Sequence, residues 1–294
     1  MASSSSSSPQ PLPAYAKYTH FLTTSPAPFV AHVEINRPRK LNSFYEAMWL
    51  ELSRLFAQLS HDPDVRAVVL SGAGDRAFTT GLDVQAASQG PLVAARSPDG
   101  PGDPARAALA LRRHIDEFQS CVSAVERCDK PVVAAVHGVA WGLAIDIACC
   151  ADVRLAAADA SFSVKEVDIG LAADIGTLSR LPKCVGSASW VKDVCLSARV
   201  FDAREALAQG FVSRVLESKA ACVAAAVQTA SLLASKSPVA VQGTKEILNH
   251  ARDHTVAESL RYTMVWNGAA LQSKDVPEAL MSGLKKTKPR FEKL

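Results

Sequence analysis

The sequence contains no apolar stretch that could cross a membrane. Its least charged interior stretch, residues 131–145, is shorter than the roughly 20 residues that a spanning helix needs, and Asp146 ends it. A disulfide framework or zinc ribbon is not indicated either, because there are seven cysteines and none forms a Cys-x-x-Cys pair. This cysteine usage is typical of a reducing compartment. Walker, Gly-x-Gly-x-x-Gly and Gly-x-Ser-x-Gly motifs are absent, so the usual signatures of nucleotide binding and serine hydrolysis are missing.

Charge and low-complexity content are also modest. The formal net charge is +3, which is too small to indicate nucleic acid as the main partner. With 48% hydrophobic and 21% charged residues, the composition is that of an ordinary globular protein. The exception is residues 1–13, where six consecutive serines and three prolines predict a disordered tail. A transit peptide is the alternative interpretation, although the segment contains no arginine.

Strand and helix signals alternate along residues 14–200, and helical periodicity dominates afterwards. Strands are expected at 29–35, 67–71, 132–136, 153–155, 161–164 and 212–215. Helices are expected behind a capping box at 43–46, and at 105–127, 142–150, 203–209, 218–235, 238–250, 255–273 and 275–286. The Gly/Pro-rich stretch 89–104 is expected to be a surface loop. The pattern predicts an α/β core over 14–200 and a helical region over 201–294 that serves assembly.

Three acids close together in the sequence are candidates for proton transfer. Glu166 follows Asp146 by 20 residues and precedes Asp174 by eight. Asp146 and Asp174 both stand among apolar residues, where an ionised carboxylate is costly unless it faces a cavity or a partner. Burial raises the pKa of such acids toward neutrality, where they can exchange protons. Each acid alone is equally consistent with a structural hydrogen bond, and Asp174 could cap a helix that starts near Ile175.

Two tight turns, at residues 76–84 and 137–143, each follow a strand signal, and the second opens a helix. Backbone N–H groups at such turns and at a helix N-terminus have no partner within the element. Two of them converging on one point would form an oxyanion hole. Two ordinary strand exits would need the same glycines, so the spacing leaves both interpretations open.

Two histidines resemble a metal site only superficially. His250 and His254 are four residues apart on an expected helix, as zinc ligands can be, but Ala251 stands where a metalloprotease would have glutamate. We therefore expect surface histidines and no metal.

Three segments together resemble the crotonase (enoyl-CoA hydratase/isomerase) superfamily. They are residues 78–83 (Phe-Thr-Thr-Gly-Leu-Asp), 130–138 and 151–154. The resemblance covers roughly residues 15 to 275. Within the superfamily, the long runs 164–182 and 252–260 are similar to the Δ3,5-Δ2,4-dienoyl-CoA isomerases. Two long and separated runs that agree make this signal specific.

The resemblance implies a crotonase-like spiral of ββα turns with a C-terminal helical region, assembled as a homotrimer or homohexamer. It implies an isomerase that converts 3,5-dienoyl-CoA to 2,4-dienoyl-CoA in the β-oxidation of unsaturated fatty acids. The partner is then an acyl-CoA thioester, and no separate cofactor is required. Glu166 and Asp174 would transfer protons between C2 and C6, with Asp146 as a third acid. The remaining implied site residues are Thr80 and Leu143, whose backbone N–H groups would bind the thioester oxygen, and Gly81, Leu82, Asp83 and Val84, which line the thioester site.

An enoyl-CoA hydratase is the alternative function. It needs two acids that position and activate water; Glu166 matches one, but Asp146 is shorter than the glutamate usual at the other. An RNA-binding protein that uses the fold as a scaffold is a more distant alternative, against which the small net charge argues. The last two residues, Lys293 and Leu294, match the peroxisomal Ser-Lys-Leu signal, whereas Glu292 stands where that signal has serine. A peroxisomal location is therefore expected, with a mitochondrial or cytoplasmic location as alternatives.

Overall fold

A computed structural model describes residues 10–88 and 103–294 of the chain. The expected tail, residues 1–13, and the expected loop, residues 89–104, lie mostly outside the described residues. At the edges of these segments, Gln10–Pro11 forms the short strand β1, and a single 3-10 turn begins at Pro13.

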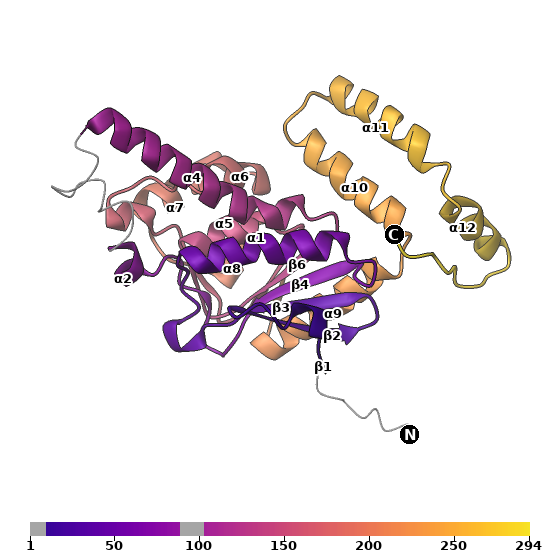
Figure 1. The fold of residues 1–294 in the computed structure, drawn as a ribbon, viewed down its shortest axis with the longest axis horizontal. Helices are drawn as coiled ribbons and strands as arrows, with labels where there is room; N and C mark the ends of the chain where they lie inside the picture. Colours follow the sequence, from indigo (N-terminus) through magenta and orange to yellow (C-terminus); the bar gives the residue numbers. More distant parts are fainter. Residues whose placement is uncertain (1–9, 89–102) are drawn as a thin grey trace.

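A seven-stranded sheet with the strand order β1-β2-β3-β4-β6-β8-β11 forms the centre of the fold (Figure 1). Neighbouring strands are parallel from β3 to β11, whereas β1, β2 and β3 pair antiparallel. The strands after β1 are β2 (Phe21–Ala27), β3 (Val30–Ile35), β4 (Ala67–Gly72), β6 (Val132–Val136), β8 (Val153–Ala157) and β11 (Arg214–Leu216). Every residue of β4 and β6 is buried, as is usual for parallel strands covered on both faces.

A smaller sheet has the order β10-β9-β7-β5. Its strands are β5 (Ala77–Thr79), β7 (Val139–Trp141), β9 (Ser161–Ser163) and β10 (Phe201–Asp202). Along the chain, β5 follows β4, β7 follows β6 and β9 follows β8, and each pair leads into a helix. These helices are α2 (Val84–Ala87), α5 (Leu143–Cys150) and the 3-10 helix η3 (Glu166–Ile169). The repeated strand–strand–helix unit confirms the predicted spiral of ββα turns.

Helices cover both faces of the large sheet. Helix α1 (Glu46–His61) packs against α4 (Pro104–Arg127) on one side, and α9 (Lys219–Ala234) contacts β3, β4, β6 and β8 on the other. Helix α1 follows the predicted capping box and buries an apolar face that includes Met48, Leu52 and Leu55, but the capping box itself is wrong. Its N-cap is Tyr45, and no side chain caps it. Phe44, which lies within the predicted capping box, is outside the helix because it forms a β-bridge with Leu82.

The C-terminal third contains the predicted helices, but they do not form one appendage. Helix α9 belongs to the core, whereas α10 (Pro238–Ala251), α11 (Val256–Ala270) and α12 (Asp275–Leu284) project from it as an arm (Figure 1). We call residues 238–284 the arm. The chain end returns to the core, where Arg66 donates hydrogen bonds to the carbonyl oxygens of Phe291 and Glu292. No helix in the described parts of the chain is both long and apolar enough to span a bilayer.

Candidate active site

The candidate site lies where three short parallel strands end. Because β5, β7 and β9 are neighbours in the small sheet, the residues that follow them emerge along one edge. There they border a cavity of about 460 Å³, whose other wall is formed by α1 and α4. The predicted site residues that line this cavity are Thr80, Leu82, Asp83, Val84, Leu143, Asp146, Glu166 and Asp174.

Gly81 lies behind the cavity wall, where the two predicted turns touch. A Cβ atom at Gly81 would lie 2.8 Å from the carbonyl oxygen of Trp141 and 3.2 Å from the amide nitrogen of Leu143. The φ angle of Gly81 is also +86°, in the left-handed region that favours glycine. The glycine therefore lets the backbone after β5 approach the N-terminus of α5.

The structure corrects the predicted oxyanion hole at one position. The N–H of Thr80 donates to the carbonyl oxygen of Leu41 at 3.1 Å, so it is already occupied. Beyond Thr80, the carbonyl oxygen of Gly81 accepts the N–H of Phe44, and the N–H of Asp83 donates to the carbonyl oxygen of Phe44. Since backbone groups alternate in direction along an extended segment, the N–H of Leu82 points away from Phe44.

The N–H groups of Leu82 and Leu143 are unoccupied donors at the cavity. Neither has an acceptor among the residues that the structure describes. Leu143 is the first residue of α5, where N–H groups lack an intrahelical partner and the helix dipole favours negative charge. Sequence spacing could not show whether the N–H of Thr80 or that of Leu82 is free, because this depends on which of the two donates to the carbonyl oxygen of Leu41.

A buried asparagine and an ion pair hold the first turn in place. Asn42 is fully buried and donates from its side chain to the carbonyl oxygens of Ala73 and Ala77, both at 2.9 Å. Arg37 pairs with Asp83 at 2.7 Å, and Asp83 also caps α2 by accepting from the N–H of Ala86. The Arg37 guanidinium lowers the pKa of Asp83. Asp83 is therefore an ionised structural anchor at the cavity edge.

The carboxyl group of Glu166 lines the cavity and has no hydrogen-bond partner among the described residues. Glu166 begins η3, and its Oε2 atom is buried without a hydrogen bond to any described residue. Burial and, to a smaller extent, the neighbouring charges of Asp146 and Asp174 raise its pKa to about 7. A Cβ atom on Gly142 would lie only 3.3 Å from Oε1 of Glu166, so the carboxyl group sits next to the turn that carries the Leu143 donor.

Asp146 is buried and already bonded. Its side chain is 1% exposed, and its Oδ1 atom accepts the N–H of Thr177 at 2.6 Å. Burial raises its pKa to about 6, although hydrogen bonds from Thr177 oppose the shift. Asp146 thus satisfies the first N–H of helix α6 (Thr177–Cys184), which supports the structural interpretation of this acid beside the functional one.

Asp174 is exposed and lines the same cavity. The predicted alternative, that it caps the following helix, is wrong, because α6 begins at Thr177 with Gly176 as N-cap and no side-chain cap. Partial burial raises the pKa of Asp174, while the nearby His114 lowers it. The carboxyl group of Asp174 makes no hydrogen bond to a described residue, so it is available to a molecule bound in the cavity.

The far wall of the cavity was not found by sequence reasoning. Trp49 on α1 stacks on Phe118 of α4, with ring centroids 3.9 Å apart and an interplanar angle of 22°. His114, also on α4, meets the edge of Trp49 at 6.0 Å. Helical periodicity could place these residues on one face, but only the packing of α1 on α4 brings them to the acids.

The two histidines of the arm lie outside this site. His250 and His254 stack on each other at 3.7 Å, and His250 also stacks on Tyr262 at 4.1 Å. Residues 10–88 and 103–294 contain no group of three or more metal-ligating His, Cys, Asp or Glu side chains.

Comparison with known proteins gives one consistent family. The enoyl-CoA hydratase/isomerase family model matches residues 27–293. The mitochondrial Δ(3,5)-Δ(2,4)-dienoyl-CoA isomerase of Mus musculus is 44% identical over 269 residues, which cover 92% of this chain and 80% of that protein. The peroxisomal isomerase of Arabidopsis thaliana is 40% identical over 265 residues, which cover 90% of this chain and 93% of that protein. An enoyl-CoA hydratase structure from Bacillus anthracis has the same fold, with a TM-score of 0.83 and 24% identity over 93% of this chain and 99% of its own.

Proposed function

This chain belongs to the enoyl-CoA hydratase/isomerase family, and we propose that it is an isomerase that converts 3,5-dienoyl-CoA to 2,4-dienoyl-CoA in the β-oxidation of unsaturated fatty acids. The observation that carries the proposal is that Glu166 and Asp174, with raised pKa values, line one cavity with two unoccupied backbone donors. The relatives that bear this isomerase name support it across most of the chain.

The reaction needs an anion-stabilising group at the thioester. Removing a proton from C2 of a 3,5-diene gives a dienolate whose negative charge reaches the thioester oxygen. We assign this oxygen to the N–H groups of Leu82 and Leu143, in place of the Thr80 donor expected from the sequence. Losing one such donor typically costs on the order of 3 kcal/mol of transition-state stabilisation.

Two carboxyl groups then move the protons. The Glu166 carboxylate takes a proton from C2, and the electron pair shifts through the conjugated system. A protonated Asp174 gives a proton to C6, which leaves double bonds at C2 and C4. Each carboxyl group returns to its starting state by exchange with water. Proton transfer of this kind involves no net oxidation, so the proposed chemistry requires no redox cofactor, and CoA enters only as part of the substrate.

The hydratase alternative finds less support in the geometry. Hydration needs two acids that hold and activate the same water molecule. Asp146, the acid expected to pair with Glu166, is already bonded to the N–H of Thr177, and its carboxyl group is almost fully buried. Hydration would also leave Asp174 without a role.

One assay separates the two functions. The purified protein is incubated with a 3,5-dienoyl-CoA, and isomerisation is followed by the ultraviolet absorbance of the conjugated 2,4-dienoyl thioester. A separate incubation with a 2-enoyl-CoA measures the rate of hydration. In D₂O we expect a single deuterium at C6 of the product by mass spectrometry. Hydration of the 2-enoyl substrate that outpaces diene isomerisation would reject the proposal.

Assembly and location are also proposed. We assign the arm to contacts within a homotrimer or homohexamer, because it exposes large apolar side chains such as Leu260 and Met264. For location we propose the peroxisome, in line with the Arabidopsis relative, although the animal relatives are named mitochondrial. Imaging of the full chain, tagged at its N-terminus, against markers of both organelles tests this proposal.

A further inference from the structure

The segment that carries Asp174 is held in place by its backbone. Residues 170–176 connect η3 to α6 without regular secondary structure. The carbonyl oxygen of Asp174 accepts a hydrogen bond from Nε2 of Gln119 at 2.5 Å, while its own carboxyl group is left uncommitted. Just after it, the N–H of Thr177 is bonded to Asp146. We call residues 170–176 the acid loop.

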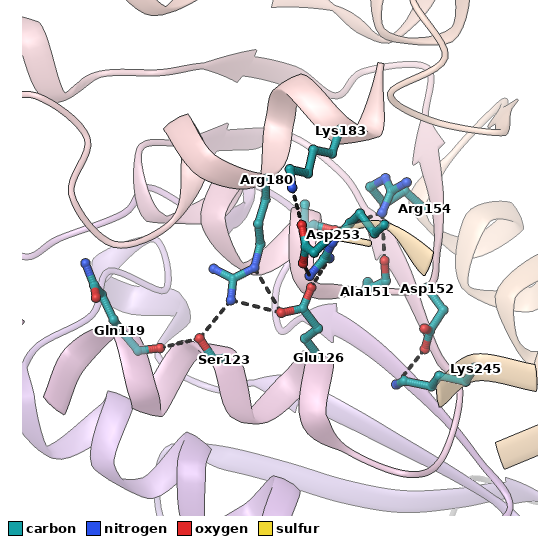
Figure 2. Close-up of polar contacts among 12 residues, drawn as sticks. Gln119, Ser123, Glu126, Ala151, Asp152, Arg154, Arg180, Lys183, Lys245 and Asp253 are labelled. Carbon is teal, nitrogen blue, oxygen red and sulfur yellow. Dashed lines mark hydrogen bonds and ion pairs between the residues drawn. The ribbon is translucent and has the colours of Figure 1, made fainter. Parts of the chain in front are cut away.

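The support for the acid loop comes from one polar stripe on α4. Gln119, Ser123 and Glu126 are spaced by four and three residues, so they share a face of the helix (Figure 2). Gln119 reaches the acid loop directly. Ser123 and Glu126 reach it through a second residue, Arg180 of α6.

Arg180 links this stripe to the start of α6. Its guanidinium donates to Oγ of Ser123 at 2.8 Å and makes two bonds to the same oxygen of Glu126, at 2.9 and 3.1 Å (Figure 2). The side chain lies against the end of the acid loop, since a Cβ atom on Gly176 would overlap its Nη1 atom at 2.2 Å. Both partners of the Arg180–Glu126 pair are only 14% exposed, so solvent screens it less than a surface pair.

The arm contributes the final member of this cluster. Arg252, at the end of α10, bonds to the second oxygen of Glu126, and the adjacent Asp253 pairs with Lys183 of α6. Glu126 therefore lies between two guanidinium groups, and together they lower its pKa despite burial. The carboxylate stays ionised and can hold Arg180 in place.

From these contacts we propose that Gln119 and Arg180 are positioning residues for the proton transfer by Asp174. They fix the acid loop to α4, so that the carboxyl group of Asp174 stays at the correct distance from the acyl chain. The inference rests on the proposed isomerase function. Because a misplacement of about 1 Å can cost up to about 100-fold in rate, removing one anchor should lower turnover more than thioester binding.

The test uses Gln119→Met, which keeps the length of the side chain and removes its donor. Gln119 is exposed, so this variant should fold with an unchanged melting temperature. We expect kcat for a 3,5-dienoyl-CoA to fall about 10-fold while KM stays within about two-fold. Arg180→Met should give the same split, and Arg180→Lys, which keeps one charged donor for Glu126, should recover part of the rate.

A second background distinguishes positioning from a general structural effect. If Gln119 acts only through Asp174, then adding Gln119→Met to an Asp174→Asn variant should lower kcat no further. Lys183→Met is the control, because it removes an exposed ion pair from α6, the helix of Arg180, without removing a contact to the acid loop. A native kcat for Gln119→Met, an equal loss in Lys183→Met, or a further 10-fold loss on Asp174→Asn would overturn the inference.

Hydrogen–deuterium exchange gives a readout that does not depend on activity. In Gln119→Met, the amides of residues 171–177 should exchange faster than in the native protein, whereas those of α5 should not change. If the native protein does not isomerise dienoyl-CoA but this exchange still accelerates, the proposed function fails while the anchoring contact stands. Unchanged exchange in an active enzyme contradicts the positioning role alone.

Discussion

At the scale of single residues, the surroundings of Glu166 set the pH at which it can act as a base. Its pKa is about 7, and only the ionised form can take a proton from C2. Because the mechanism also needs a protonated Asp174, we expect a bell-shaped dependence of kcat/KM on pH, with one limb set by the Glu166 pKa near 7. Glu166→Gln should lower kcat on the order of 10²–10⁴-fold, measured by diene absorbance. Asp168→Asn, on the same short helix but exposed, is the control and should retain the native profile.

Asp174 is expected to act as an acid, so its substitution should separate binding from chemistry. Asp174→Asn cannot donate the proton to C6, and we expect most of the isomerase activity to be lost. Because the side chain is exposed and makes no hydrogen bond to a described residue, folding should be unaffected. Isothermal titration with a non-reactive acyl-CoA should give the native affinity. Native turnover in this variant would remove Asp174 from the mechanism.

Asp146 should affect stability more than rate. Its pKa is raised from 3.8 to about 6 in the folded protein, so the stability it contributes is present below pH 3.8 and is lost as pH rises through 6. A shift of about two pKa units corresponds to on the order of 3 kcal/mol. Asp146→Asn keeps an oxygen for the N–H of Thr177 but does not ionise. We expect the unfolding free energy of the variant minus that of the native protein to be larger at pH 7.5 than at pH 4.5, because only the native protein loses stability as Asp146 ionises.

Denaturant unfolding at both pH values measures this difference, and an equal difference at the two would contradict it. Activity of the variant should fall less than in Glu166→Gln, since Asp146 is bonded to the protein rather than to the substrate.

The acids could be predicted from the sequence because a carboxylate among apolar residues is costly unless it faces a cavity or a partner. Asp146 and Asp174 stand out in this way, and both line the cavity. The backbone donors could not be assigned in the same way, since every residue of the turn carries an N–H. Whether Thr80 or Leu82 is free depends on Leu41 and Phe44, which are about 40 residues earlier in the chain.

At the scale of elements, the contact between two turns builds the anion site. Gly81→Ala would place a Cβ atom 2.8 Å from Trp141 and force a left-handed alanine, which by itself costs roughly 1–2 kcal/mol. We expect the turn to move away from α5, with a loss of at least about 10-fold in kcat as a donor is displaced. The control is Gly268→Ala in α11, which has open space and should stabilise by about 0.5–1 kcal/mol. Thermal unfolding and the diene assay measure both effects.

Elements with a strong local periodicity formed where the sequence predicted them, whereas elements fixed by contacts with distant residues were not predicted. The helix predicted over 105–127 is α4 (Pro104–Arg127), because its long amphipathic pattern is local. By contrast, the strand β7 (Val139–Trp141) and the helix η3 (Glu166–Ile169) were not predicted as such. Strand β7 pairs with β5, some 60 residues earlier, so its conformation depends on a long-range register that no local pattern contains.

At the scale of the whole molecule, alternation of strands and helices predicts an α/β core, and the family resemblance adds the spiral. The sequence could not say which C-terminal helices leave the core. Both α9 and α10 have helical periodicity, yet α9 covers the large sheet while α10 belongs to the arm (Figure 1). Periodicity shows that a face is apolar but not what it packs against.

The arm exposes an apolar face that we expect another copy of the chain to cover. Val256, Leu260 and Met264 follow each other at four-residue spacing on α11 and are 78%, 65% and 67% exposed. Large exposed apolar patches are rare on monomers and mark interaction sites. The double substitution Leu260→Glu/Met264→Glu places two charges on this face, which would be buried unpaired in an assembly. We expect a monomer by analytical ultracentrifugation, with native circular dichroism. Arg261→Glu, an exposed charge change on the same helix, should leave the assembly intact, and a native oligomer in the double variant would exclude this face as the interface.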